Sequence, residues 1–130
     1  MAAKYYSNGA QGEVDMTTVI QDIVTGQTNG SDVRRLIAIN TGATDRILTL
    51  YDTNDKYIDS VLIPANAGLP GALGTTVPAV DVLNGIGIAG SEYDAYGNKF
   101  YRLWGAAKLR AKQNTGTDLQ LQWSRSDYEA

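Results

Sequence analysis

The sequence contains neither cysteine nor histidine among its 130 residues. Their absence excludes disulfide bridges, zinc sites built on thiolate or imidazole ligands, a cysteine nucleophile and a histidine general base. A Ser-His-Asp triad is therefore impossible. No apolar run approaches the length of about 18 residues that a membrane-spanning helix needs, and the first residues lack the apolar stretch of a secretory signal. We therefore expect no membrane partner and synthesis in a cytoplasm.

Charge of either sign is also scarce, since 19% of the residues are charged and the formal net charge is −3. Such a balance gives no overall attraction to phosphate backbones, so a nucleic-acid partner is not expected. The apolar fraction of 43% is too high for a disordered chain, and the length suits one compact domain. The sequence therefore predicts a single folded domain.

Short apolar runs alternate with clusters of Gly, Asn, Asp and Thr, and hardly any segment keeps a helical period. This rhythm predicts an all-β fold, a two-layer antiparallel β-sandwich of jelly-roll type with long loops. Strands are expected over residues 33–40, 47–51, 57–63, 77–83, 86–89, 107–113 and 119–123. Residues 16–24 have helical spacing of their apolar side chains, but their Thr and Val content and the turn-like segment that follows favour a strand.

Two hairpins are predicted. Residues 52–56 supply turn chemistry between the second and third of these strands, and residues 114–118 join the last two. In the second hairpin, Leu109 and Ala111 on one strand and Leu119 and Leu121 on the other are expected to face inward.

The N-terminal residues 1–13 have little to bury except Tyr5 and Tyr6. We therefore predict an extended N-terminal arm that a partner orders, followed by the β-sandwich domain over residues 14–130. A Gly/Pro-rich loop over residues 64–76 carries Leu69 and Leu73, and loops of this length are commonly functional.

Three patterns could hold a ligand, and each has a simpler interpretation. Gly85–Gly90 matches G-x-G-x-x-G, but no helix-length segment follows, so the glycines are interpreted as structural. Residues 52–55 begin like a calcium loop, yet Tyr57 stands where the turn glycine belongs, so a hairpin turn is favoured. A cation held by Glu92, Asp94 and Asn98 lacks any recurring ligand spacing.

Paired carboxylates are the one hydrolytic option that the composition leaves open. The candidates, Asp52, Asp59 and Asp81, fall in or beside separate short strands. We therefore predict no catalytic residue, no metal and no cofactor, and expect the protein not to be an enzyme.

Lys108, Arg110 and Lys112 form a basic stripe on one predicted strand face, which Arg102 could extend. Phosphates or an acidic protein could bind such a stripe. The favoured interpretation is a solvated outer face beside Gln120 and Gln122.

Tyrosine dominates the aromatic residues, with eight Tyr and two Trp against one Phe. Tyrosine is enriched at surfaces that a partner covers. Tyr57 and Trp104 fall in or beside strands and are assigned to the core or its flank. The predicted interface comprises Tyr5, Tyr6, Leu69, Leu73, Tyr93, Tyr96 and Tyr128.

The order of several short segments resembles the small β-sandwich accessory proteins of tailed-bacteriophage virions, over about residues 16–128. These segments are Ile39-Asn40-Thr-Gly, Leu48-Thr-Leu50, Val61-Leu-Ile-Pro64-Ala, Asp94-Ala-Tyr-Gly-Asn98, Gly105-Ala-Ala-Lys-Leu109-Arg-Ala-Lys and Asp127-Tyr128-Glu. The resemblance implies a non-enzymatic capsid decoration or cement protein, made in the host cytoplasm and carried on the virion surface. It also implies the major capsid protein as partner and self-association, with a homotrimer favoured. The alternative is a carbohydrate- or receptor-binding β module of a phage tail.

Overall fold

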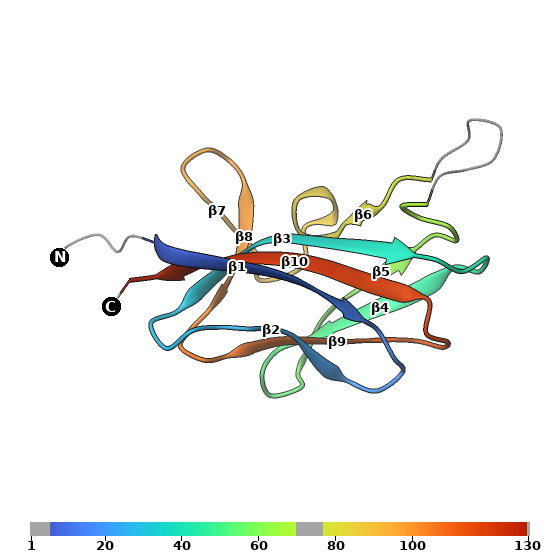
Figure 1. The fold of residues 1–130 in the computed structure, drawn as a ribbon, viewed down its shortest axis with the longest axis horizontal. Helices are drawn as coiled ribbons and strands as arrows, with labels where there is room; N and C mark the ends of the chain where they lie inside the picture. The colour runs from blue at the N-terminus through green and yellow to red at the C-terminus, as the bar shows by residue number, and fades with distance from the viewer. Residues whose placement is uncertain (1–5, 70–76, 130) are drawn as a thin grey trace.

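Two antiparallel sheets pack against each other in a computed structural model that describes residues 6–69 and 77–129 (Figure 1). Sheet A has the order β1 (Tyr6–Asp15), β10 (Leu119–Tyr128), β3 (Ser31–Asn40), β8 (Lys99–Leu103) and β7 (Glu92–Tyr93), with β6 (Val80–Asp81) also paired to β3. Sheet B has the order β2 (Gln21–Thr25), β9 (Lys108–Gln113), β4 (Arg46–Tyr51) and β5 (Tyr57–Ile63). This arrangement confirms the predicted all-β fold of two antiparallel layers.

The core fills the space between the sheets with side chains that alternate along each strand. Leu48 and Leu50 of β4 are fully buried, whereas the neighbouring Ile47 faces outward and is 41% exposed. The inward positions predicted for β9 and β10 are also buried, as the period of two requires. The largest fully buried apolar side chains are Met16, Leu36, Leu48, Leu50, Ile63, Leu83, Ile88, Leu109, Leu119 and Leu121.

A β-bulge interrupts the alternation in the middle of β3. The register against β10 shifts between Ser124 and Arg125, so Arg34 has no residue directly opposite it. Because of this extra residue, Val33 and Leu36 both face the core, although they are three positions apart. Arg34 and the exposed Arg35 consequently share the outer face of sheet A.

The predicted hairpin of residues 107–113 and 119–123 is wrong. β9 pairs with β2 and β4 in sheet B, whereas β10 pairs with β1 and β3 in sheet A. The connection therefore crosses between the layers, and Gln113 is buried at the crossing, where its Oε1 accepts a 3.0 Å hydrogen bond from the Leu119 amide. Two strands in opposite layers both turn every second, apolar side chain toward the core. Their sequences therefore show the same alternation of apolar and polar residues as the two strands of a hairpin.

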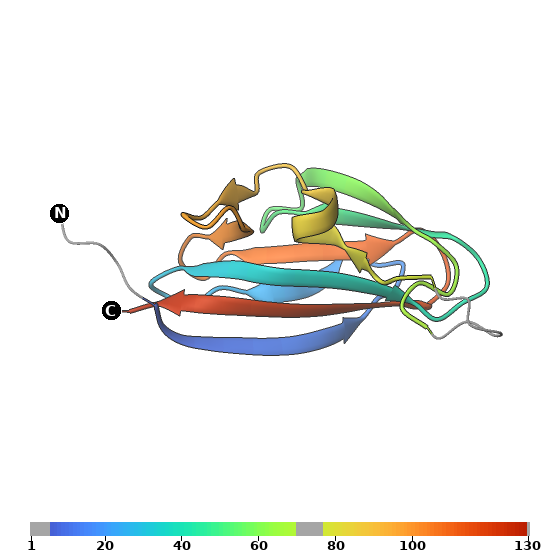
Figure 2. The same ribbon diagram turned by 90° about the horizontal axis from the view of Figure 1, so that it is seen from above.

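Residues 6–13, predicted as part of an arm, instead form most of β1, an edge strand of sheet A (Figure 2). β1 pairs with β10 from Tyr6 opposite Tyr128 to Asp15 opposite Gln120. The segment 16–24, predicted as a strand, forms one only from Gln21 onward, as β2. An edge strand needs a hydrogen-bonding partner on one side only, and β10 supplies it for β1. β1 therefore forms although few of its residues are apolar.

The strands predicted at 77–83 and 86–89 are also wrong, apart from the two residues of β6. The apolar run continues as a π-helical turn, η2 (Val82–Ile86), because the Asp81 carboxylate accepts a 2.8 Å bond from the Asn84 amide. Gly87 ends the turn at a φ of 77°, a value that favours glycine. Within the described ranges, no helix has the length and apolar character to cross a membrane.

Candidate functional site

An aromatic–arginine patch lies on the outer face of sheet A, around the paired residues Tyr6 and Tyr128. Figure 1 shows that β1 begins and β10 ends at this end of the sheet. Along β8, Leu103 and the core-packed Tyr101 face inward, so the alternate residues face outward. The pairing of Asp32 with Arg102 and of Tyr6 with Tyr128 gathers four strands at this place. The patch consists of Tyr6, Arg34, Phe100, Arg102, Trp104 and Tyr128.

Asp32 on β3 lies beneath this patch and is fully buried. Its Oδ2 accepts hydrogen bonds from the hydroxyl groups of Tyr6 at 2.7 Å and Tyr128 at 2.6 Å. Its Oδ1 accepts a 2.9 Å bond from Nε of Arg102, whose guanidinium also donates to the Tyr128 hydroxyl. One carboxylate therefore connects β1, β3, β8 and β10.

The protonation states of this cluster follow from its contacts. Burial alone would raise the pKa of Asp32, but the hydrogen bonds from Arg102, Tyr128 and Tyr6 outweigh it and hold the pKa below its ordinary value. Burial and the bonds to Asp32 raise the pKa of both tyrosines. At neutral pH the cluster is thus one carboxylate compensated by one guanidinium and two neutral phenols, which stabilises the fold.

The lowered pKa of Asp32 predicts an acid-dependent stability. Because the folded-state pKa lies below the unfolded value, the contribution of Asp32 is present above about pH 4 and is lost as the pH falls through the folded-state pKa. The difference in unfolding free energy between the native protein and Asp32→Asn should be constant from pH 7 to 5 and shrink below pH 4. Urea unfolding at several pH values measures it, and a difference that grows toward acid pH would contradict the assignment.

The two arginines of the patch are held between aromatic rings. The guanidinium carbon of Arg102 lies 5.1 Å from the Phe100 ring centroid and 5.2 Å from that of Trp104. Arg34 lies 5.8 Å from the Tyr6 centroid and forms a 2.8 Å ion pair with Asp94. Trp104 is nevertheless 72% exposed and Tyr6 46% exposed. The patch is therefore a fixed surface with large exposed aromatic groups.

The residues predicted as one interface lie in different places. Tyr6 and Tyr128 belong to the patch, whereas Tyr93 on β7 is 68% exposed and Tyr96, in the turn before β8, is 91% exposed. The segment 64–69, which carries the partly buried Leu69, lies at the opposite end of the sandwich (Figure 1). The two other predicted residues, Tyr5 and Leu73, lie outside the described residues.

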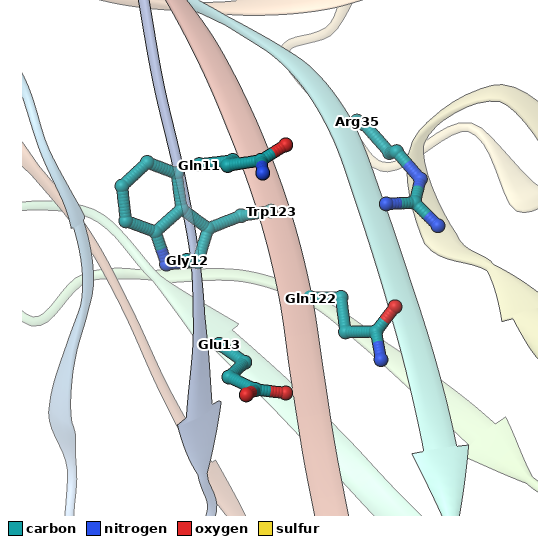
Figure 3. A pocket seen from close by; sticks show the side chains of 6 residues that line it. All are labelled: Gln11, Gly12, Glu13, Arg35, Gln122 and Trp123. Atoms are coloured by element: carbon teal, nitrogen blue, oxygen red, sulfur yellow. The ribbon is translucent and has the colours of Figure 1, made fainter.

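A hollow of about 280 Å³ lies farther along the same outer face, over β1, β10 and β3. Figure 3 shows that its polar side chains come from these three neighbouring strands. Trp123 borders the hollow from the inner face of β10, where a Cβ on Gly12 would lie only 2.8 Å from the indole. The lining residues are Gln11, Gly12, Glu13, Arg35, Gln122 and Trp123.

The predicted cation loops have local structural roles. The Asp52 carboxylate accepts bonds from the amides of Asn54 and Lys56, which confirms the hairpin turn. Asp94 accepts bonds from the amides of Tyr96 and Asn98, as well as from Arg34. Residues 6–69 and 77–129 contain no group of acidic side chains placed to hold a metal ion.

The residues considered for hydrolysis and for nucleotide binding also have local structural roles. Asp59 accepts a bond from the Ala89 amide at 3.2 Å, and Asp81 caps η2. Gly85 lies inside η2, so the glycine pattern does not lead from a strand into a phosphate-binding helix.

The basic stripe lies on β9 in sheet B, where acidic side chains neutralise part of it. Lys108 pairs with Asp22 at 3.0 Å, and Arg110 pairs with Asp22 at 2.9 Å and with Asp55. Arg102, Gln120 and Gln122 belong to sheet A, so the predicted extension and the predicted neighbours are wrong.

Sequence reasoning did not select Asp32, Arg34, Arg35, Phe100 or Trp104 as candidate site residues. Trp104 was assigned to the core or its flank, but both it and Tyr57, at 63%, are largely exposed. The spacing Phe100-x-Arg102-x-Trp104 is the signal that could have placed Trp104 on an outer face. Comparison of the chain with protein families, curated proteins and solved structures gives no match.

Proposed function

We propose that this chain is a non-enzymatic structural protein that binds another protein through the aromatic–arginine patch. The exposure of Trp104, beside an arginine that buried Asp32 fixes in place, carries the proposal. Tryptophan, tyrosine and arginine are the residues that contribute most to protein interfaces. Because the patch is already held by internal contacts, a partner would bind it with little loss of side-chain entropy.

The charge of the patch favours a protein over a nucleic acid. Arg34 has its carboxylate partner Asp94, and Arg102 has Asp32, so neither guanidinium offers an uncompensated charge to a phosphate. The net charge of −3 points in the same direction.

The partner proposed is the major capsid protein of a tailed-phage virion. The resemblance of residues 16–128 to accessory virion proteins supports this choice, and the all-β sandwich agrees with the fold of that group. Attachment as a homotrimer on the capsid surface, after synthesis in the host cytoplasm, belongs to the same proposal. Repeated attachment on a lattice would strengthen contacts that are individually weak.

Trp104→Ala is expected to weaken capsid binding by about 30-fold, the effect of losing about 2 kcal/mol at a central interface residue. The measurement is co-sedimentation with capsids assembled from the major capsid protein of the same genome. Tyr57→Ala is the matched control, because Tyr57 is similarly exposed but lies on sheet B.

Failure of the native protein to co-sediment with those capsids would refute the proposed partner. Equal binding by the native protein and Trp104→Ala would refute the patch as the binding surface. Unchanged binding by Tyr57→Ala with loss in Trp104→Ala is the supporting result.

A further inference from the structure

Three of the polar side chains around the hollow on sheet A have no partner within the described chain. Gln11, Glu13 and Arg35 form no side-chain hydrogen bond or ion pair with residues 6–69 or 77–129. The other five arginines, at positions 34, 46, 102, 110 and 125, all pair with carboxylates. Arg35 is thus the arginine whose donors are available to a ligand.

The bulge in β3 places Arg35 beside this hollow. In a regular strand Arg34 and Arg35 would face opposite sides, but the extra residue turns both to the outer face. Gln122 on β10 lies between Arg35 and the β1 side chains (Figure 3). The one hydrogen bond that its side chain forms within the described residues is a long 3.4 Å bond to Gln120. Three neighbouring strands therefore present donors and acceptors around one space.

We propose that this hollow binds an acidic saccharide. The volume of about 280 Å³ lies near the lower limit for small-molecule sites, which suits one or two sugar units. Sugar hydroxyl groups both donate and accept, so they match the amides of Gln11 and Gln122 and the carboxylate of Glu13. The planar guanidinium of Arg35 matches the carboxylate of a sugar acid with two parallel hydrogen bonds.

The surface next to the hollow is lined by small residues. The next outward pair toward the patch is Gly9 and Ser126, two small residues that lie opposite each other on β1 and β10. This inference does not rest on the proposed capsid binding, since different residues carry it and Trp104 takes no part in it.

The test is an NMR titration of the ¹⁵N-labelled protein with tri-galacturonic acid. Shifts are expected at amides of β1, β10 and β3 around the hollow, and Arg35→Gln should weaken binding at least tenfold. Lys112→Gln removes a positive charge from sheet B and should leave binding unchanged. Neutral maltotriose should bind at least tenfold more weakly than the acidic trimer.

Four outcomes would overturn the inference. They are no shifts around the hollow, unchanged binding by Arg35→Gln, maltotriose binding as strong as that of the acid, and tri-glutamate binding as strong as that of the acid. The last result would assign the hollow to acidic peptides. If the urea midpoint of Arg35→Gln shows partial unfolding, Gln11→Ala on the exposed edge strand provides the same test with an expected severalfold loss.

Discussion

Asp32→Ala is expected to lower the free energy of unfolding by about 3 kcal/mol, because it removes the acceptor that Arg102, Tyr6 and Tyr128 share. Breaking a buried ion pair typically costs about 3–5 kcal/mol. The lower end applies here, since the Arg102 side chain is 25% exposed and water can reach it after the substitution. The neighbouring strand ends of β1 and β10 should also lose their connection to β3.

Asp22→Ala is the matched control for this prediction. Asp22 also contacts two basic side chains, Lys108 and Arg110, but it is 45% exposed. Exposed ion pairs contribute about 0–1 kcal/mol, so this variant should remain close to the native protein in urea unfolding. Equal destabilisation by the two variants would show that burial of Asp32 does not determine its contribution.

Leu36→Ala is expected to destabilise the protein by about 3 kcal/mol, since the side chain is fully buried on the central strand β3. The loss combines the transfer free energy of the removed atoms with the cavity that they leave. The result also tests the bulge, because without it Leu36 would face outward if Val33 faced inward.

Leu62→Ala makes the same chemical change at a side chain that is 57% exposed on β5. It should cost less than about 1 kcal/mol, as exposed positions do. Thermal or urea unfolding of both variants measures the contrast. A small loss for Leu36→Ala would mean that β3 does not have the register described for it.

The strands that the sequence predicts well are those with one buried and one solvated face. β5 was predicted over the residues it occupies, and the predictions for β3, β4 and β9 differ by one or two residues. In these segments the apolar alternation has a direct physical cause, because every second side chain enters the core. The pairing of strands lacks such a local signal, and β9 and β10 were therefore placed in one sheet instead of two.

β1 could not be predicted for a different reason. Its residues are mostly polar or small, since one edge and one face are free of the core. The segment that contains η2 was predicted as a strand although it is a helical turn, because Val82 and Leu83 are buried and apolar like strand residues. Capping by Asp81 decides between strand and turn there, and an aspartate before an apolar run is a weak signal alone.

The candidate sites depend on contacts that sequence spacing does not reveal. Asp32 meets Tyr6, Arg102 and Tyr128 only after β1, β3, β8 and β10 have come together in sheet A, over separations of up to 96 residues. Arg35 reaches the hollow because of a bulge that one irregularity in the alternation, Val-Arg-Arg-Leu, indicates only in retrospect. Composition directed attention to tyrosine, but it could not separate the exposed rings from those that bond Asp32.

The position of β10 between β1 and β3 also governs how the molecule can be made. Sheet A cannot be completed while the ribosome still holds residues 119–128. β1 pairs with no strand other than β10 in the described structure. Until those residues emerge, β3 must expose its unpaired edge, and assembly then depends on contacts between distant parts of the chain, which form slowly. Premature termination within β10 would thus leave two unprotected strands and a product prone to aggregation.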